Sequence, residues 1–289
     1  MNRYRLIVSR EGFLLNAIVR ELPLLPERAV REALKRRDIL VNGMRTSKNV
    51  MVKPGDEVLV YTPQEQAEIP VLHEDEQLLI VAKPSGVNTD ENARSRFSIL
   101  AWARERSGGE YEPFLVHRLD NQTSGLLLLA KDEKTAETLM NAFREHRIEK
   151  IYNCLVKGEI APASAILTAW LKKDAVQGKV NVSEKQSGDA KRIVTEYSTL
   201  RAGKVSYLQV KLHTGRTHQI RAHLAFLGHP VIGDEVYGDR AFNRAYGKRG
   251  LMLCACELAF PDRFDVPCLS GKRFVIKPPF NEEILEKNG

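Results

Sequence analysis

The sequence predicts an α+β protein in which a small α/β unit precedes a larger domain built on a mixed, mainly antiparallel β-sheet. From residue 71 onward, apolar runs typical of strands follow one another without the regular helical crossovers that a parallel sheet needs. The first 62 residues contain a helix-and-hairpin pattern of their own. A polar stretch that carries Pro63 and Pro70 lies between the two parts. We therefore expect domains at 1–62 and 71–289, joined by a linker at 63–70.

The first domain is expected to contain one amphipathic helix followed by a tight hairpin. Pro26 suits the start of the helix, and Glu27 lies in its first turn. One stripe of this helix is apolar and another is basic. The apolar stripe comprises Ala29, Val30, Ala33 and Leu34, and the basic stripe comprises Arg28, Arg31 and Lys35. Asn42-Gly43 is a strong signal for a two-residue hairpin, and Pro54-Gly55 predicts a further turn before a last strand.

Positive charge is concentrated in this first domain. Residues 1–62 hold 12 Lys and Arg against 7 Asp and Glu, whereas the rest of the chain holds 32 against 30, for a net charge of +7. Clustered basic charge favours a polyanionic partner such as RNA, although an ordinary solvated surface is the alternative. The residues expected to contact RNA are Arg28, Arg31, Lys35, Arg36 and Arg45.

The stretch AVREALKRRDILVNGMR, followed by VKPGDEV, resembles the RNA-binding domain named after the small-subunit ribosomal protein S-four. One position departs from that family's pattern. Glycine is usual in the turn between the helix and the next strand, where it relieves a left-handed backbone conformation, and this chain has Arg37 there. Either Arg37 adopts that conformation at some cost or the turn differs.

The larger domain combines short strands with two helices. Strands are expected within 77–84, 114–120, 125–132, 151–160 and 206–214. Asp132 is a candidate N-cap for a helix over 132–150. The expected buried positions of that helix are Ala136, Leu139, Met140 and Phe143.

A second helix follows the segment HTGRT. Thr217 is expected to cap it, and Gly228 and Pro230 are stop signals after Leu227. Its buried stripe is expected to comprise Ile220, Leu224 and Leu227, with His218 and Arg221 together on another side. A Gly-Arg-Thr turn before a helix N-terminus rich in Arg and His is typical of a site for an anionic ligand.

Neither the cysteines nor the histidines are spaced as metal ligands. No CxxC pair occurs, so we expect buried free thiols at the four cysteines, which are Cys154, Cys254, Cys256 and Cys268. Four of the seven histidines lie between residues 213 and 229, but no two are separated by the four residues that place ligands on one helical face. We therefore expect no metal.

No apolar run approaches the roughly 20 residues that a membrane helix needs. Charged residues interrupt the first 13 residues, which argues against a signal peptide. We therefore expect no membrane association and a cytoplasmic location.

The segment HRLDNQTSG, residues 117–125, is the strongest candidate for chemistry because polar residues stand there between two apolar runs. It is not a kinase catalytic loop, because the order of its residues differs and no glycine-rich phosphate loop occurs. A serine hydrolase is excluded because no G-x-S-x-G elbow occurs. A retaining glycosidase needs a second nearby carboxylate; no neighbouring acid is obvious in the sequence, although folding could supply one. Asp120 can act as a nucleophile or general base if a cation such as Arg221 keeps it ionised. A purely structural Asp–Arg pair is the equal alternative.

From about residue 71 to the C-terminus, the chain closely resembles the RluA-type pseudouridine synthases. The segments that carry this resemblance are VAKPSGV, VHRLDNQTSGLLLLAKD, KIYNCLVKG and LHTGRTHQIRAHLAFLGHPVIGDEVYG. The second and fourth segments are long and specific. The resemblance implies an isomerase that converts uridine in RNA to pseudouridine without a cofactor or a metal, on a sheet of the pseudouridine synthase type, and it implies a monomer.

The resemblance also implies roles for individual residues. Asp120 matches the essential aspartate, Tyr152 the active-site tyrosine and Arg221 the arginine that pairs with the aspartate. Arg118 matches the arginine that enters the RNA helix where the target nucleotide leaves it, and Leu253 matches an aliphatic residue beneath the base. Further substrate contacts are expected from His117, Arg216 and Thr217, the last two at phosphates. No role is predicted for Asn121.

Three functions remain open from the sequence. The first is a pseudouridine synthase for ribosomal RNA, most of all that of the large subunit, because relatives with that substrate carry a basic front domain. The second is a synthase acting on transfer RNA or on both RNAs. The third is a non-catalytic RNA-binding assembly factor, against which the intact set of Asp120, Tyr152 and Arg221 argues.

Overall fold

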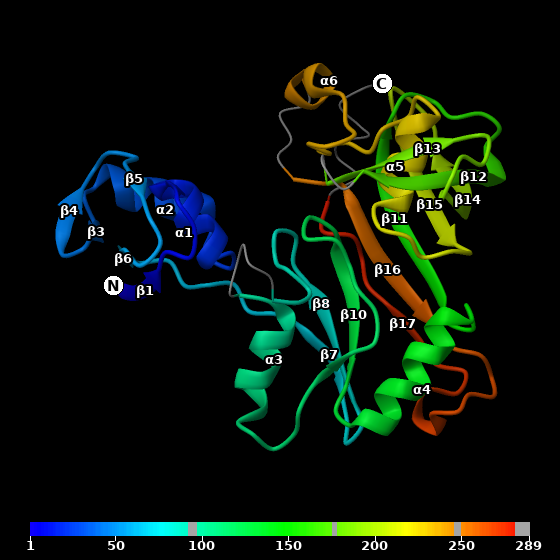
Figure 1. Cartoon of the computed structure of the whole chain (residues 1–289), viewed down its shortest axis with the longest axis horizontal. Helices are drawn as coiled ribbons and strands as arrows, with labels where there is room; N and C mark the ends of the chain where they lie inside the picture. Colours follow the sequence, from blue (N-terminus) through cyan, green and yellow to red (C-terminus); the bar gives the residue numbers. More distant parts are fainter. Residues whose placement is uncertain (92–96, 175–177, 246–249, 281–289) are drawn as a thin grey trace.

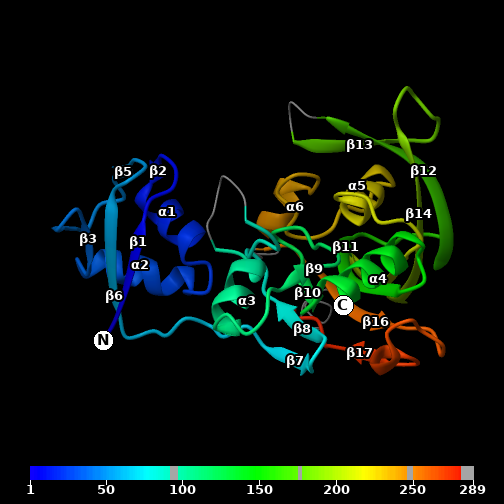
Figure 2. The same cartoon turned by 60° about the horizontal axis from the view of Figure 1, so that its bottom comes forward.

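The computed structural model of the protein describes residues 1–91, 97–174, 178–245 and 250–280. An N-terminal unit lies at one end of the molecule, and a long twisted sheet with helices against it forms the rest (Figures 1 and 2). The arrangement is α+β with mainly antiparallel strands, which confirms the predicted fold class. The predicted boundaries at residues 62 and 71 stay predictions. Among the described residues, no helix is long and apolar enough to cross a membrane.

The N-terminal unit packs two helices on a four-stranded antiparallel sheet of order β1-β6-β3-β4. Its elements are β1 (Asn2–Ile7), β2 (Gly12–Phe13), α1 (Leu14–Glu21), α2 (Glu27–Lys35), β3 (Ile39–Val41), β4 (Met44–Thr46), β5 (Met51–Val52) and β6 (Glu57–Thr62). The four predicted apolar positions of α2 are all buried, and its basic residues are exposed, as the 3.6-residue period requires. Leu24, which precedes α2, packs into the core of the large domain.

The two turns of this unit follow the sequence signals. Asn42 and Gly43 both have positive φ, 48° and 80°, and close the β3–β4 hairpin in which Val41 faces Met44. Arg37 has φ 62°, so it adopts the left-handed conformation for which glycine is usual. The first of the two alternatives for Arg37 is therefore correct.

The large sheet contains eleven strands, and nine of them follow the order β13-β12-β14-β15-β11-β16-β10-β8-β7. They are β7 (Val71–Glu74), β8 (Leu78–Lys83), β10 (Ser124–Ala130), β11 (Glu149–Lys157), β12 (Ser164–Asp174), β13 (Lys179–Ser183), β14 (Lys191–Arg201), β15 (Val205–Leu212) and β16 (Leu253–Ala259). The other two, β9 (Phe114–Leu115) and β17 (Arg273–Val275), pair with β10 and β16. Among the described strands, only the β10–β16 pair is parallel.

Helices cover the two faces of this sheet. They are α3 (Ile99–Ser107), α4 (Glu133–Arg144), α5 (Gln219–Phe226) and α6 (Arg240–Ala245). Successive residues of β10 enter different cores, since Leu127 packs with α3 and α5 whereas Leu128 packs with α4. Both faces of β10 are thus buried, which explains its continuous apolar run. At the start of β10, Gly125 is required because a Cβ atom there would lie 2.3 Å from the Ala255 carbonyl oxygen.

Two helix caps were predicted, with different outcomes. Asp132 caps α4, because its Oδ1 accepts a hydrogen bond of 2.8 Å from the Thr135 N–H. Thr217 does not cap α5, since His218 occupies the N-cap position with φ 54° and no side-chain cap is formed. The helix therefore begins one residue later than predicted, after the left-handed His218, and the preference of threonine for the N-cap position is not realised.

Three burial predictions also need correction, and the first is Leu227, which packs against the core but is only half-buried. Met140 is 41% exposed on α4, while its predicted neighbours Ala136, Leu139 and Phe143 are buried. The buried arc of α4 is therefore narrower than its apolar stripe. Three cysteines are buried free thiols as expected, but Cys268 is exposed.

Candidate active site

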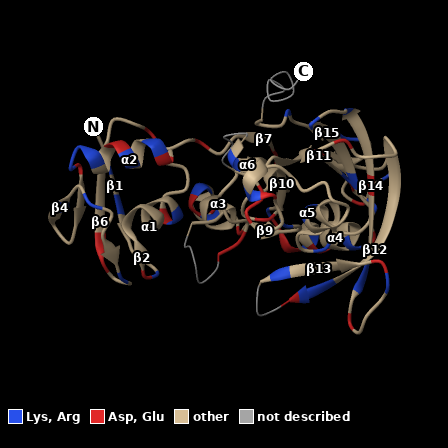
Figure 3. Ribbon diagram, turned by 90° about the horizontal axis from the view of Figure 1, so that it is seen from above, with Lys and Arg blue, Asp and Glu red and all other residues tan. Residues whose placement is uncertain are grey.

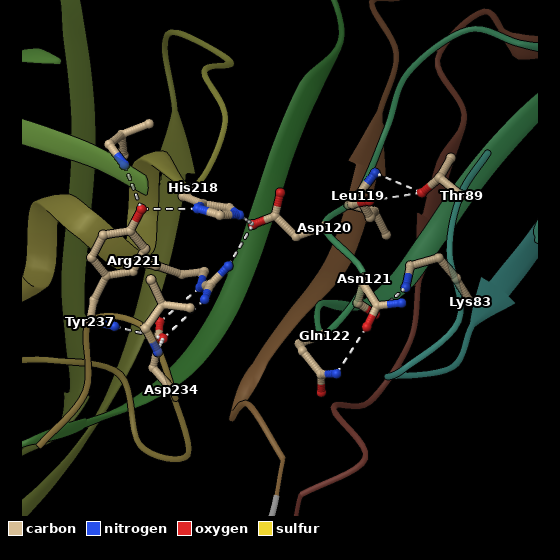
Figure 4. Close-up of polar contacts among 12 residues, drawn as sticks. Lys83, Thr89, Leu119, Asp120, Asn121, Gln122, His218, Arg221, Asp234 and Tyr237 are labelled. Atoms are coloured by element: carbon tan, nitrogen blue, oxygen red, sulfur yellow. Dashed lines mark hydrogen bonds and ion pairs between the residues drawn. The ribbon is translucent and has the colours of Figure 1, made fainter. Parts of the chain in front are cut away.

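Asp120 lies in the turn between β9 and β10, and a network of hydrogen bonds holds that turn (Figure 4). Thr89 Oγ1 donates to the Leu119 carbonyl at 2.8 Å and accepts from the Leu119 N–H at 3.2 Å. Asn121 Nδ2 donates to the Gly86 carbonyl at 2.9 Å and to Asn88 Oδ1 at 2.8 Å. Asn121, for which the sequence predicted no role, therefore ties the Asp120 turn to the loop after β8.

The buried ammonium of Lys83 braces the same turn. Lys83 Nζ donates to three carbonyl oxygens, those of Val87 at 2.7 Å, Asn121 at 3.0 Å and Pro84 at 3.1 Å. Burial lowers the pKa of Lys83 to about 7, and the charge of Asp120 acts in the opposite direction. Three acceptors match the three N–H donors of the ammonium group, so Lys83 joins both loops under Asp120. Sequence reasoning missed this residue, because a lysine ending a strand normally signals exposure.

Arg221, on α5, joins Asp120 to a second carboxylate. Its Nη1 lies 3.3 Å from Asp120 Oδ2, which is the predicted pair. Its Nε and Nη2 donate to Asp234 Oδ2 and Oδ1 at 2.7 and 2.9 Å, so that Asp234 takes the bidentate face. The Asp234 side chain is fully buried, and Asp120 is 24% exposed. Arg221 is therefore anchored by Asp234 and presents its remaining nitrogen to Asp120.

The electrostatics of this trio follow from burial and pairing. Burial acts against ionisation of Asp234, but hydrogen bonds from Arg221 and from the Val236 and Tyr237 N–H groups lower its pKa overall. Burial likewise opposes the charge of Arg221, and the two carboxylates raise its pKa overall. Asp234 was missed from the sequence. It stands in the segment GDEVYG, but no spacing rule relates a residue beyond a helix to an arginine within it.

Tyr152 and Leu253 belong to the core beside Asp120. Tyr152 is 7% exposed on β11 and Leu253 is 3% exposed on the neighbouring strand β16. Burial raises the pKa of Tyr152, and the charge of nearby Asp120 raises it further, so the phenol keeps its proton at neutral pH. Both side chains lie in the core cluster that also contains Leu119 and Ile220, from the Asp120 turn and α5. The structure therefore brings together the three predicted catalytic residues.

The remaining predicted substrate contacts divide into exposed positions and the half-buried His117. Arg118, Arg216 and Thr217 are exposed on the two loops that carry Asp120 and His218. Among the described residues, the guanidinium of Arg118 forms no ion pair. His117 faces the opposite way, because its Nε2 accepts the Leu128 N–H at 3.1 Å and its ring packs on Phe143, 4.5 Å between centroids. These contacts are structural, so substrate binding by His117 stays a prediction.

The basic residues predicted to bind RNA are all exposed on the N-terminal unit. Some of these basic side chains form ion pairs with acidic neighbours, and Figure 3 shows both charge signs on α2. Arg28 pairs with Glu32 at 3.0 Å, and Arg31 pairs with Glu27 at 2.7 Å. Arg45 reaches Asp38 at 3.4 Å. Lys35 and Arg36 form no ion pair among the described residues, so the C-terminal end of α2 carries the least compensated charge.

The buried imidazole of His117 predicts a pH dependence of stability. Burial and nearby Lys150 lower the pKa of His117 from 6.5 to about 3, which keeps Nε2 free to accept its hydrogen bond. Between these pH values the unfolded chain binds one proton more than the folded chain. The free energy of unfolding should therefore fall by about 1.4 kcal/mol per pH unit below pH 6.5 from this residue alone. Urea titrations from pH 4 to 6.5 should show a shallower dependence for His117→Asn, and identical slopes would contradict this.

The comparisons with known proteins agree with this site. Residues 77–226, which include Asp120, Tyr152 and Arg221, match the RNA pseudouridylate synthase family. An RNA pseudouridine synthase of Aquifex aeolicus is 31% identical over 240 residues, covering 76% of this chain and 75% of that protein. The ribosomal large subunit pseudouridine synthase C of Vibrio cholerae is 30% identical over 268 residues, covering 85% and 84%.

A solved structure extends the likeness to the fold. The human RNA pseudouridylate synthase domain containing 1 superposes with a TM-score of 0.64 at 26% sequence identity, covering 78% of this chain and 89% of that one. The matched segment contains more than half of the chain and all three of the clustered residues. The chain therefore belongs to the RNA pseudouridylate synthase family and is an isomerase that forms pseudouridine in RNA.

Proposed function

We propose that this enzyme modifies uridines of large-subunit ribosomal RNA and that Asp120 is its essential carboxylate. The observation that supports the catalytic assignment is the Arg221 bridge, in which the guanidinium contacts the partly exposed Asp120 carboxylate on one side and the buried Asp234 carboxylate on the other. The choice of RNA rests on the Vibrio cholerae relative, whose name states that it acts on the large ribosomal subunit.

The chemistry assigns distinct tasks to the clustered residues. Pseudouridine formation breaks the N1–C1′ bond of uridine, forms a C5–C1′ bond and releases the hydrogen of C5. A carboxylate can serve this sequence as a nucleophile or as a base. The Tyr152 ring is suited to stack on the uracil, and its protonated hydroxyl to assist proton transfer. Leu253 supplies an apolar surface beneath the base.

Access to Asp120 requires that the target uridine leave its stack. Base flipping costs a few kcal/mol of unstacking, and a planar cation can occupy the vacated place. Arg118 fits that task because it is exposed, lies two residues from Asp120 and is not held by an ion pair with a described residue. Arg216 and Thr217 are exposed on the opposite loop, where they can contact phosphates of the same strand.

The N-terminal unit is suited to hold the RNA at a distance from the catalytic residues. Its helix α2 and the β3–β4 hairpin expose the basic residues that the resemblance to the ribosomal protein S-four RNA-binding domain predicts to contact RNA. Lys35 and Arg36 should contribute most to the electrostatic attraction of RNA. The charges of Arg28 and Arg31 are already compensated, by Glu32 and Glu27 respectively. Removing one such charge in Arg36→Gln should weaken RNA binding and reduce its salt dependence by about one counterion, whereas Arg28→Gln should do less.

Mapping pseudouridine in cellular RNA tests the proposed substrate. Cells that carry the gene with Asp120→Asn should lack pseudouridine at one or more positions of large-subunit ribosomal RNA that cells with the unchanged gene modify. All other pseudouridines serve as internal controls, because other enzymes form them. Missing sites in transfer RNA alone would replace the proposed substrate with transfer RNA, and missing sites in both RNAs would identify a dual enzyme.

A further inference from the structure

His218 connects Asp120 to a tyrosine that no part of the proposed mechanism uses. His218 Nε2 lies 3.8 Å from Asp120 Oδ2, and its Nδ1 lies 2.9 Å from the hydroxyl oxygen of Tyr237 (Figure 4). The same hydroxyl oxygen accepts a hydrogen bond of 2.9 Å from the Val180 N–H of β13. A chain of contacts therefore runs from the backbone of β13 through Tyr237 and His218 to the carboxylate.

The hydrogen-bond partners of Tyr237 favour one tautomer of His218. Tyr237 Oη already accepts from Val180, so its own hydrogen needs an acceptor, and among the described residues Nδ1 of His218 is the acceptor within reach. With the Tyr237 hydroxyl as the donor, Nδ1 is unprotonated. The hydrogen of the neutral imidazole consequently lies on Nε2, the atom that faces Asp120.

The surrounding charges favour the neutral imidazole. Asp120, Arg221 and Asp234 face His218 together with Tyr237. Burial lowers the pKa of His218, and Arg221 lowers it further, while the two carboxylates act in the opposite direction without reversing the shift. The imidazole therefore carries one hydrogen, not two, at neutral pH.

Backbone geometry indicates that this orientation is imposed. His218 has φ 54°, a left-handed conformation that residues with a Cβ adopt rarely. Its ring is then held edge to face against Tyr237, with centroids 5.6 Å apart. The fold thus keeps the strained residue at the point where α5 starts, directly beside Arg221 and Asp120.

We propose that His218 is a positioning residue whose Nε2–H, fixed by Tyr237, engages Oδ2 of Asp120 together with Nη1 of Arg221 and thereby reserves Oδ1 for the substrate. The Arg221 guanidinium and the His218 ring both face Oδ2. Among the described residues, Oδ1 accepts no hydrogen bond. The 3.8 Å separation is longer than a hydrogen bond, so the proposal requires it to shorten when RNA binds. This inference rests on the proposed role of Asp120.

The tautomer can be tested without RNA. Nitrogen-15 NMR on the full chain labelled at histidine should show the His218 signal as the neutral Nε2–H tautomer at pH 7.5, with the signal assigned by its loss in His218→Gln. Tyr237→Phe removes the donor to Nδ1, so the two tautomers should then interconvert. An Nδ1–H tautomer or an imidazolium in the unchanged protein would overturn the proposal whatever the RNA substrate is.

Two substitutions at position 218 separate a donor from a packing role. The amide NH₂ of Gln can occupy the place of Nε2–H, whereas Leu has a similar volume and no donor. Unlike glycine, both Gln and Leu carry a Cβ atom, so both have the cost of positive φ and are matched in backbone strain. Tritium release from large-subunit ribosomal RNA transcripts labelled at C5 of uridine measures kcat and KM for each variant.

His218→Leu should lower kcat by about 10- to 100-fold with KM changed less than about threefold, and His218→Gln should recover most of the lost kcat. Equal losses in both variants, or no loss in either, would overturn the positioning role. Absence of tritium release by the unchanged protein would instead count against the proposed substrate, and the NMR result would stand apart from it.

Discussion

Asp120→Asn should abolish pseudouridine formation while leaving a folded protein. Asparagine keeps the size of the side chain but supplies neither a nucleophilic oxygen nor a base, so the rate should fall on the order of 10³-fold or more. Arg221 keeps its bidentate partner Asp234 in this variant, and the lost pair is 3.3 Å long and partly exposed. The free energy of unfolding should therefore change by less than about 1 kcal/mol. Tritium release from uridine-labelled RNA and urea denaturation measure the two quantities.

A matched control for this variant is Asp189→Asn. Asp189 is 78% exposed and pairs with Lys172 at 3.2 Å, so the substitution removes the same charge from a solvated ion pair. Its activity should remain within about twofold of the unchanged enzyme. RNA binding by Asp120→Asn should also persist, because the basic surface is intact. Measurable turnover by Asp120→Asn above about one tenth of the original rate would refute the assignment of Asp120.

Asp234→Asn should have the larger effect on stability. It removes one charge from a fully buried bidentate pair and leaves Arg221 with only the longer contact to Asp120. Breaking a buried pair on one side costs about 3–5 kcal/mol, because the remaining charge stays desolvated. Arg221 should also lose its fixed direction, so kcat should fall in the fraction of protein that remains folded. Urea denaturation of the purified variant checks the first effect directly.

The exposed pair of Asp265 with Arg147 provides the comparison for Asp234. The two groups are 2.8 Å apart, but Asp265 is 60% exposed. Asp265→Asn should change the free energy of unfolding by less than about 0.5 kcal/mol, because water screens the pair and replaces it. If Asp234→Asn were as mild as this control, Arg221 would not depend on Asp234, and the bridge described for the active site would be incorrect.

Local patterns in the sequence were sufficient for several elements. The buried face of α2, the Asn42-Gly43 hairpin and the Asp132 cap all arise from interactions within a few residues. Thr217 failed as a cap because His218, with a left-handed φ of 54°, occupies the N-cap position of α5. The predicted burial of Met140 was wrong because the spacing of apolar residues does not show how much of the helix surface the neighbouring elements cover.

The residues of the candidate site likewise divide into those that sequence patterns predict and those that they do not. Asp120 was predictable because polar residues interrupt two apolar runs, and Arg221 because a buried carboxylate needs a cation. The family motifs then supplied Tyr152. The contributions of Lys83, Asp234 and Tyr237 were not predictable, since each acts through a hydrogen bond whose partner is set by the packing of separate strands and loops.

Patterns in the sequence predicted the fold class, the amphipathic helix of the N-terminal unit and Asp120 as a candidate acidic residue, whose catalytic role stays a prediction. Periodicity, turn chemistry and charge are properties of neighbouring residues, so they can be read along the chain. Only the tertiary structure showed which oxygen of Asp120 Arg221 contacts, which carboxylate anchors Arg221 and which residues face His218. The Asp120–Arg221 contact joins residues 101 positions apart, and it exists only after the sheet has brought its loops together.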